Sequence, residues 1–296
     1  MGQALAARYA SARAVFDEVD AALGQHLSRL MFDGPETELT LTANAQPALM
    51  AVSIAALRAL ECEAGIELER HVAFVAGHSL GEYSALAAAG ALSVADAARL
   101  LRLRGTAMQD AVGPNAGAMA ALIGADSAIG EAIATEAAQG EVCEVANDNG
   151  GSQVVLSGAA AAVRRAVDLA KARGIKRAVM LAVSAPFHCA MMQPAADAMK
   201  RALGAVEIKA PCVPLISNTT ARPVTAAADI RRGLVDQVCG TVRWRESVEW
   251  LAEAGVDRFV EVGAGKVLSG LTRRIAPGAS AASVGLPDDI AAYATA

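Results

Sequence analysis

The chain has 296 residues, of which 54% are apolar, so it can bury a sizeable core and is not a disordered protein. Aromatic residues make up only 3%, which favours close-packed, alanine-rich helices over a β-sandwich or barrel. The net charge is −5 with acids and bases interspersed, so we expect no nucleic-acid partner, since that requires a clustered basic face.

Two stretches without formal charge, 39–57 and 178–196, raise the question of a membrane span. Both contain proline and amide side chains that are costly inside a bilayer, so we expect no membrane span. No signal peptide is expected either. Five widely spaced cysteines without a CxxC pair argue for reduced thiols, no metal site and a cytoplasmic location.

The first third of the chain reads mainly as helix. Apolar periodicity predicts helices over 4–23 and 47–64, and a further helix over 94–111 with Ser93 as its N-cap. Between the last two, the apolar run 72–76 predicts a strand and the alanine-rich segment 84–89 a helix. The stretch "FVAGHSLGE" (74–82) therefore joins a strand to a helix through a sharp turn.

The order of elements changes after "VGPNAG" (112–117). The patterns predict strands over 118–123, 142–146, 153–157 and 177–183, and helices over 127–138 and 159–172. This βαββαβ succession is typical of a ferredoxin-like unit, with "NDNGGS" (147–152) as a hairpin-type turn.

The earlier pattern resumes from residue 186. We expect strands over 213–217 and 259–262 and helices over 226–238 and 245–254. The predicted fold class is α/β: a large α/β-hydrolase-like domain with a short parallel sheet, formed by 1–112 and 186–296, into which a ferredoxin-like subdomain of residues 113–185 is inserted.

"GHSLG" (77–81) matches the G-x-S-x-G nucleophile elbow in the strand–turn–helix context that the motif requires. The turn would lift the Ser79 hydroxyl clear of the sheet. The helix that begins near Leu80 would direct amide N–H groups at an oxyanion. The alternative is a tight turn whose serine has no chemical role.

A serine nucleophile needs a general base, and the chain has four histidines. His26 and His71 lie in polar surroundings, and the side chain of His78 should point away from that of its neighbour Ser79. This leaves His188 in "VSAPFHCAMM", after a predicted strand and Pro186. The alternative for His188 is a satisfied core histidine, and we interpret the adjacent Cys189 as a buried structural thiol.

Several motifs in this order resemble the malonyl-CoA:acyl carrier protein transacylase family, related to the acyltransferase domains of polyketide synthases. They are "QPALMA" (46–51), "GHSLGEYSAL" (77–86), "RLRGTAMQDA" (102–111), "GAMAALIG" (117–124), "QVVLSG" (153–158), "VSAPFH" (183–188), "VRW" (242–244) and "EVGAGKVLSGL" (261–271). The likeness runs over nearly the whole chain.

The resemblance implies a ping-pong reaction. Ser79 would take the malonyl group from malonyl-CoA as an ester, and the pantetheine thiol of acyl carrier protein would then collect it. His188 would be the base in both halves. The family's histidine is oriented by a backbone carbonyl, which corresponds to Gln237 here.

The resemblance also implies the substrate contacts. Arg104 would clamp the free carboxylate of malonate, and its planar guanidinium suits that role; otherwise it would be a solvated helix arginine. Gln46 would line the same pocket, Phe187 matches the malonyl-preferring form of the motif, and His78 would also bind substrate. Asn147 would face the coenzyme or pantetheine arm. We expect no cofactor and a monomer.

The match departs from the family at its start, where members carry a strand and a "PGQGSQ" loop that helps form the oxyanion hole. We expect this strand and one oxyanion donor to be missing, from a start codon assigned too late. Competing hypotheses are a serine esterase, a catalytically impaired carrier-protein-binding module, and the transacylase associated with malonate decarboxylase.

Overall fold

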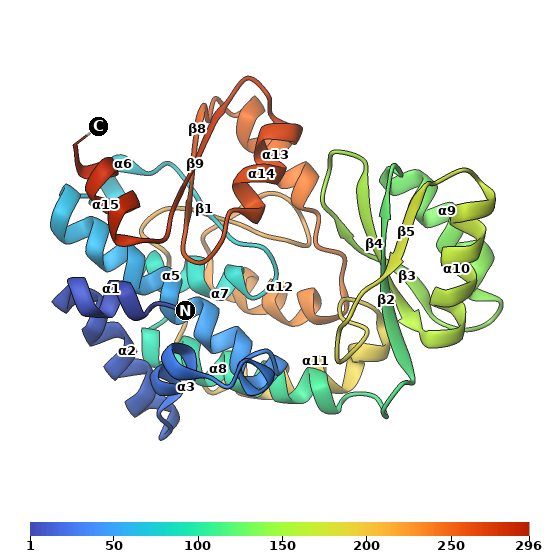
Figure 1. Cartoon of the computed structure of the whole chain (residues 1–296), viewed down its shortest axis with the longest axis horizontal. Coiled ribbons are helices and arrows are strands. Elements are labelled where there is room, and N and C mark those ends of the chain that lie inside the picture. Colours follow the sequence, from blue (N-terminus) through green and yellow to red (C-terminus); the bar gives the residue numbers. More distant parts are fainter. Residues whose placement is uncertain (296) are drawn as a thin grey trace.

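The computed structural model describes residues 1–295 and has a mixed α/β fold with small sheets. A larger, helix-rich part contains both termini, and a sheet covered by two helices stands at its side (Figure 1). The helices of the larger part before that sheet are α1 (Gln3–Arg8), α2 (Ala10–Leu23), α3 (Leu27–Asp33), α4 (Glu36–Leu39), α5 (Thr42–Ala64), α6 (Leu68–His71), α7 (Gly81–Ala88) and α8 (Val94–Asp110). Those after it are α11 (Gln193–Gly204), α12 (Ala227–Cys239), α13 (Trp244–Glu253), α14 (Val267–Ile275) and α15 (Pro287–Ala294).

The larger part contains two small sheets. In one, β1 (Val75–Ala76) pairs in parallel with β6 (Leu215–Ile216), which pairs antiparallel with β7 (Pro223–Val224). In the other, β8 (Arg258–Val262) pairs in parallel with β9 (Ser280–Val284). The parallel pairing of β1 with β6 matters most for function, because the chain segments that leave the carboxyl ends of both strands meet at one edge.

The side sheet has four antiparallel strands in the order β3-β4-β2-β5. Its elements are β2 (Gly117–Ile123), α9 (Ser127–Ala138), β3 (Cys143–Asp148), β4 (Gln153–Ala159), α10 (Ala160–Ala172) and β5 (Arg177–Met180). The predicted βαββαβ order of elements is therefore confirmed, as is the turn between β3 and β4, where Gly150, Gly151 and Ser152 have positive φ.

Other element predictions meet mixed outcomes. The helix over 94–111 is confirmed together with its cap, because Ser93 Oγ accepts a hydrogen bond from the Asp96 N–H. A single helix over 4–23 is wrong, since extended backbone at Tyr9 divides it into α1 and α2. The strand over 72–76 shrinks to β1, because only Val75 and Ala76 find ladder partners.

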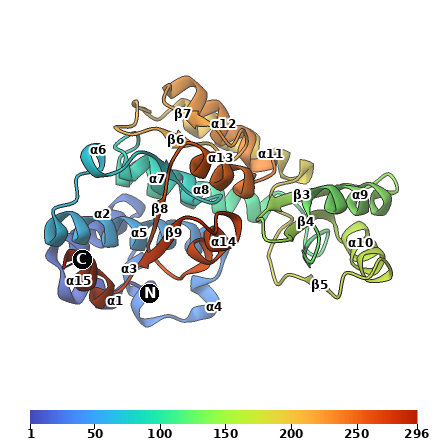
Figure 2. The ribbon, with the colours of Figure 1, turned by 90° about the horizontal axis from the view of Figure 1, so that it is seen from above.

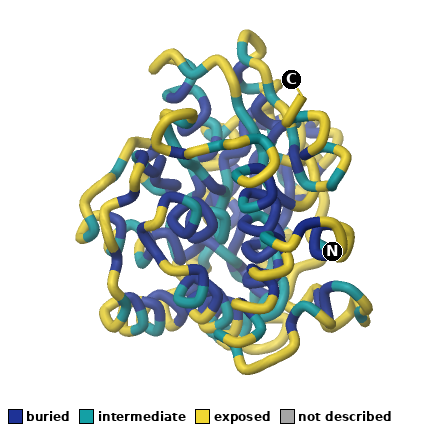
Figure 3. The backbone as a smooth tube through the Cα atoms, turned by 90° about the vertical axis from the view of Figure 1, so that its left-hand side faces the viewer, coloured by how far each residue is buried: buried dark blue, intermediate teal, exposed yellow. Residues whose placement is uncertain are grey.

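Apolar side chains form separate cores in the two parts. The larger part is built around α5, α8 and α2, with fully buried residues such as Met50, Ile54 and Leu101. The side sheet packs α9 and α10 on one face around Leu122, Ile133 and Leu156. Buried backbone runs through the middle of the molecule in Figure 3, and Figure 2 shows the sheet with its two helices standing apart from the remaining elements.

Two glycines permit the close approaches that build the region between β1 and α7. A Cβ at Gly77 would lie 2.0 Å from the backbone oxygen of Gly81, so the turn after β1 can close only without a side chain there. A Cβ at Gly105 would lie 2.5 Å from the backbone oxygen of Thr42. Helix α8 thus contacts the start of α5, which brings the residue before Gly105 on α8, Arg104, close to α5.

Within residues 1–295, no helix has the length and apolarity that crossing a membrane requires.

Replacing Gly77 with alanine should destabilise the protein, because the new methyl group would collide with the backbone of Gly81. We expect Gly77→Ala to lower the free energy of unfolding by about 1–3 kcal/mol, measured by urea denaturation. Gly81→Ala is the matched control, since a Cβ there meets no atom within 4 Å. Equal stability of the two variants would contradict the close approach at Gly77.

Candidate active site

Ser79 lies in the sharp turn between β1 and α7, with a backbone φ of 52° that a non-glycine residue rarely adopts. The side chain of Asn218, just after β6, holds this turn on both sides. Its Oδ1 accepts a hydrogen bond from the Ser79 N–H at 2.7 Å, and its Nδ2 donates to the Gly77 carbonyl at 2.8 Å. The strained serine is thus fixed by the neighbouring parallel strand.

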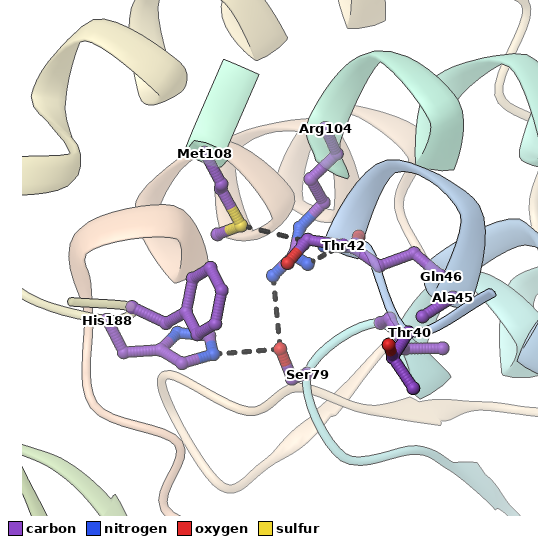
Figure 4. A pocket seen from close by; sticks show the side chains of 10 residues that line it. Thr40, Thr42, Ala45, Gln46, Ser79, Arg104, Met108 and His188 are labelled. Carbon is purple, nitrogen blue, oxygen red and sulfur yellow. Dashed lines mark hydrogen bonds between the residues drawn. The ribbon is translucent and has the colours of Figure 1, made fainter. Parts of the chain in front are cut away.

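The structure brings His188 against Ser79. The Ser79 Oγ lies 2.8 Å from His188 Nε2, and His188 Nδ1 lies 2.8 Å from the backbone oxygen of Gln237 on α12 (Figure 4 shows the first contact). Since a carbonyl can only accept, Nδ1 carries the proton and Nε2 is free to accept the serine hydroxyl proton. His188 also has a positive φ, 59°, so both members of the pair are held in uncommon backbone conformations.

The surroundings of His188 keep its imidazole neutral. Burial lowers its pKa to about 3, and the nearby positive charge of Arg104 acts in the same direction, while the hydrogen bond to the Gln237 carbonyl acts against both. At neutral pH the imidazole is therefore uncharged and can act as a general base.

Arg104 lies beside this pair with only 1% of its surface exposed. Its guanidinium donates to Ser79 Oγ at 3.1 Å, to Gln46 Oε1 at 2.8 Å and to Gln237 Oε1 at 2.8 Å. All three acceptors are uncharged, and Arg104 Nε has no partner among residues 1–295. A buried cation without an anion is costly, so this site suits an anionic group that arrives from outside.

These side chains surround a cavity of about 190 Å³. Figure 4 shows Ser79, His188, Arg104 and Gln46 converging on it from different elements. Its lining consists of Thr40, Thr42, Ala45, Gln46, Ser79, Leu80, Arg104, Met108, Phe187 and His188. The backbone N–H of Leu80, at the start of α7, has no hydrogen-bond acceptor among the described residues.

Two of the residues expected at the substrate do not line this cavity. His78 Nε2 lies 2.9 Å from Asn149 Oδ1 and 3.3 Å from Asn147 Nδ2, and its ring centroid is 5.7 Å from that of Trp244. His78 and Ser79 therefore have different partners, although the backbone between them is a turn and not the extended chain assumed for the prediction. His78 and Asn147 thus form a separate cluster where the β3–β4 turn meets α13.

Sequence reasoning missed residues that hold the site from behind. Asn218 follows the strand expected over 213–217, and Glu82 was visible at the end of "FVAGHSLGE". Glu82 is 2% exposed and contacts Gln237. The available signal for Asn218 was its place as a polar residue just after a predicted strand. Its contact with Ser79 could not be inferred without knowing that this strand pairs with β1. Residues 1–295 contain no cluster of His, Cys, Asp and Glu that could hold a metal ion.

Comparisons with known proteins point to one family. The family model described as acyl transferase domain matches residues 1–289. A malonyl CoA-acyl carrier protein transacylase of Bacillus subtilis strain 168 is 46% identical over 276 residues, which cover 93% of this chain and 86% of the relative.

Solved structures are similar over the whole chain. An acyl-carrier-protein-S-malonyltransferase from Bartonella henselae has a TM-score of 0.96 and 54% identity, with 99% of this chain and 93% of that one covered. A malonyl-transacylase in complex with its type II PKS acyl-carrier protein has a TM-score of 0.95 and 41% identity, with coverage of 100% and 94%.

The reactivity of Ser79 should persist into acid, because the lowered pKa keeps His188 neutral below the usual value of 6.5. We expect the rate at which a sulfonyl fluoride labels Ser79 to stay level as pH falls through 6.5 and to decline only well below it. Mass spectrometry measures the labelling, and circular dichroism checks that the protein stays folded. A midpoint at or above 6.5 would contradict a neutral, buried His188.

Proposed function

The chain belongs to the acyl transferase family, and on that basis we propose that it moves a malonyl group from coenzyme A to the phosphopantetheine thiol of acyl carrier protein. The reaction is ping-pong, through a malonyl ester of Ser79. The observation that carries the proposal is the buried Arg104 guanidinium 3.1 Å from Ser79 Oγ. In a malonyl thioester, one methylene separates the carboxylate from the reacting carbon, so a cation must lie directly beside the nucleophile.

In the first half-reaction, His188 Nε2 takes the Ser79 hydroxyl proton while Oγ forms a bond to the thioester carbon. The Gln237 carbonyl accepts from Nδ1 and stabilises the imidazolium that results. The Leu80 N–H donates to the oxyanion. When the carbon–sulfur bond breaks, the imidazolium returns its proton to the sulfur of coenzyme A.

In the second half-reaction the same groups act in the opposite order. The pantetheine thiol gives its proton to His188 Nε2 and its sulfur attacks the ester carbon. The ester bond to Oγ then breaks, and the proton passes to Ser79. No cofactor takes part, since every proton and acyl transfer uses Ser79, His188 or a substrate.

Arg104 selects the acyl group. Its free N–H donors bind the malonyl carboxylate, and Gln46 holds the guanidinium in place from α5. An acetyl group would leave the buried charge without its anion, so it reacts less well. Phe187 lines the cavity, and we propose that Asn147, which contacts His78, faces the coenzyme or pantetheine arm.

The serine esterase hypothesis fits these contacts less well. The esterase triad has an acid as the partner of its histidine, whereas His188 Nδ1 contacts a backbone carbonyl. A carboxylate-binding arginine in the cavity has no function in simple ester hydrolysis.

We also propose a division of the chain into an α/β-hydrolase-like acyltransferase domain of 1–112 and 186–296 and an inserted ferredoxin-like subdomain of 113–185. The strand order β3-β4-β2-β5 and the separate apolar cores support this division. We propose a cytoplasmic location on the grounds that all five cysteines are free.

Mixing the protein with radiolabelled malonyl-CoA should give a covalent malonyl-enzyme that persists in water until carrier protein arrives. Ser79→Ala should abolish the label, because no other hydroxyl contacts His188 in residues 1–295. Ser84→Ala, at a buried serine on the following helix α7, is the control and should label normally. A stoichiometric ester in Ser79→Ala would refute the role of Ser79, and rapid hydrolysis of the wild-type ester would favour an esterase.

Removing the charge of Arg104 should reduce malonyl transfer more than acetyl transfer. We expect Arg104→Met to lower kcat/KM for malonyl-CoA by about 10²-fold or more, while acetyl-CoA changes little. Arg99→Met, an exposed position on the same helix α8, is the control. Unchanged selectivity in Arg104→Met would remove this arginine from the acyl-group site.

A further inference from the structure

A buried polar network lies directly behind the site, between the start of α7 and α12 at the centre of the molecule (Figure 1). It consists of Glu82 in the first turn of α7, Gln237 on α12 and Asn218 after β6, which are 2%, 0% and 1% exposed. None of them lines the cavity. Burial on this scale requires that every polar atom find a partner, so the contacts of the network are informative.

The hydrogen bonds fix the orientation of the Gln237 side-chain amide. Its Nε2 donates to Glu82 Oε2 at 2.5 Å and to the Ser79 carbonyl at 2.9 Å. Its Oε1 accepts from Arg104 Nη2 at 2.8 Å. Because two acceptors lie on one side of the amide and a donor on the other, only this orientation satisfies all the groups.

The network needs a carboxylate at position 82. The Glu82 oxygens face two donors, the Gln237 amide at Oε2 and the Asn218 backbone N–H, 3.4 Å from Oε1. A glutamine at this position could accept from only one of them and would turn its own N–H groups toward the other. Burial raises the pKa of Glu82 to about 7, while these hydrogen bonds and the charge of Arg104 act in the opposite direction.

The Gln237 amide separates Glu82 from Arg104. A carboxylate in direct contact with the guanidinium would occupy the N–H groups that an incoming carboxylate needs. The Gln237 amide between them hydrogen-bonds to both groups, so the guanidinium has no carboxylate in direct contact. Arg104 therefore gains a fixed position without losing its capacity for substrate.

We propose that Glu82 is a positioning residue that acts through Gln237 to hold Arg104 ready for the acyl carboxylate and thereby sets the preference for malonyl over acetyl groups. This inference rests on the proposed function. It assigns to the Gln237 side chain a task separate from that of its backbone carbonyl, which contacts His188.

The test compares acyl-group preference in two variants. Glu82→Gln should lower the ratio of kcat/KM for malonyl-CoA over acetyl-CoA by about tenfold, mainly through KM for malonyl-CoA, because the Gln237 amide is no longer held in one orientation. The double variant Glu82→Gln with Gln237→Glu keeps the charge of the network but moves the carboxylate into contact with Arg104. It should lower the ratio further, because the new carboxylate competes with substrate.

Calorimetric titration with malonate supplies a readout that does not depend on turnover, and malonate should bind both variants more weakly than the wild type. Glu69→Gln, the same exchange on the exposed helix α6, is the control and should change nothing. Urea denaturation shows whether each variant is folded, and Glu82→Asp, which keeps the carboxylate but shortens the side chain that holds the Gln237 amide, carries the test if Glu82→Gln unfolds.

Equal losses for malonyl-CoA and acetyl-CoA in these variants, or no loss, would overturn the positioning role of Glu82. Absence of malonyl transfer in the wild-type protein would instead overturn the proposed function, so the two failures are distinguishable.

Discussion

A guanidinium buried beside a hydroxyl is the constraint on which the site depends. Arg104 is removed from water yet has only uncharged acceptors, and one of them is the oxygen of Ser79. Such a cation is tolerated in an apolar interior only if dipoles on every side offset the lost hydration. Gln46 and Gln237 supply these dipoles from α5 and α12, and the close contact at Gly105 brings α8 near enough for them to do so. The helices around the cavity are thus arranged around one charge.

The same cation influences the acid–base chemistry. Together with burial it lowers the pKa of His188, which leaves an uncharged base next to the serine at neutral pH. A carboxylate partner for His188 would raise that pKa, whereas the Gln237 carbonyl fixes the tautomer with a smaller effect. A single residue, Gln237, contacts the base through its backbone and the cation through its side chain. The positions of His188 and Arg104 are therefore coupled through Gln237.

Local signals in the sequence predicted much of the fold. Helix α9 was expected at its observed bounds, and the Ser93 cap located the start of α8, because both depend on residues within one turn. The short strands were less predictable, since β1 forms only where Val75 and Ala76 pair with Leu215 and Ile216, which lie far away in the sequence. The pairing of Ser79 with His188 followed from elimination among four histidines. Glu82 and Asn218 escaped notice because their roles depend on which strands and helices become neighbours.

The hydrogen bonds of Asn218 to the strained turn reduce the number of N–H groups that can stabilise an oxyanion there. The amide of the serine itself is already committed to the Asn218 side chain, so it has no capacity left for negative charge that develops on a reacting carbonyl. A backbone N–H that holds the turn in place cannot also donate to an oxyanion, and this turn has few N–H groups. In the proposed reaction, the N–H of Leu80 is therefore the donor within this turn that can bind the oxyanion, and any further donor must come from another segment of the chain.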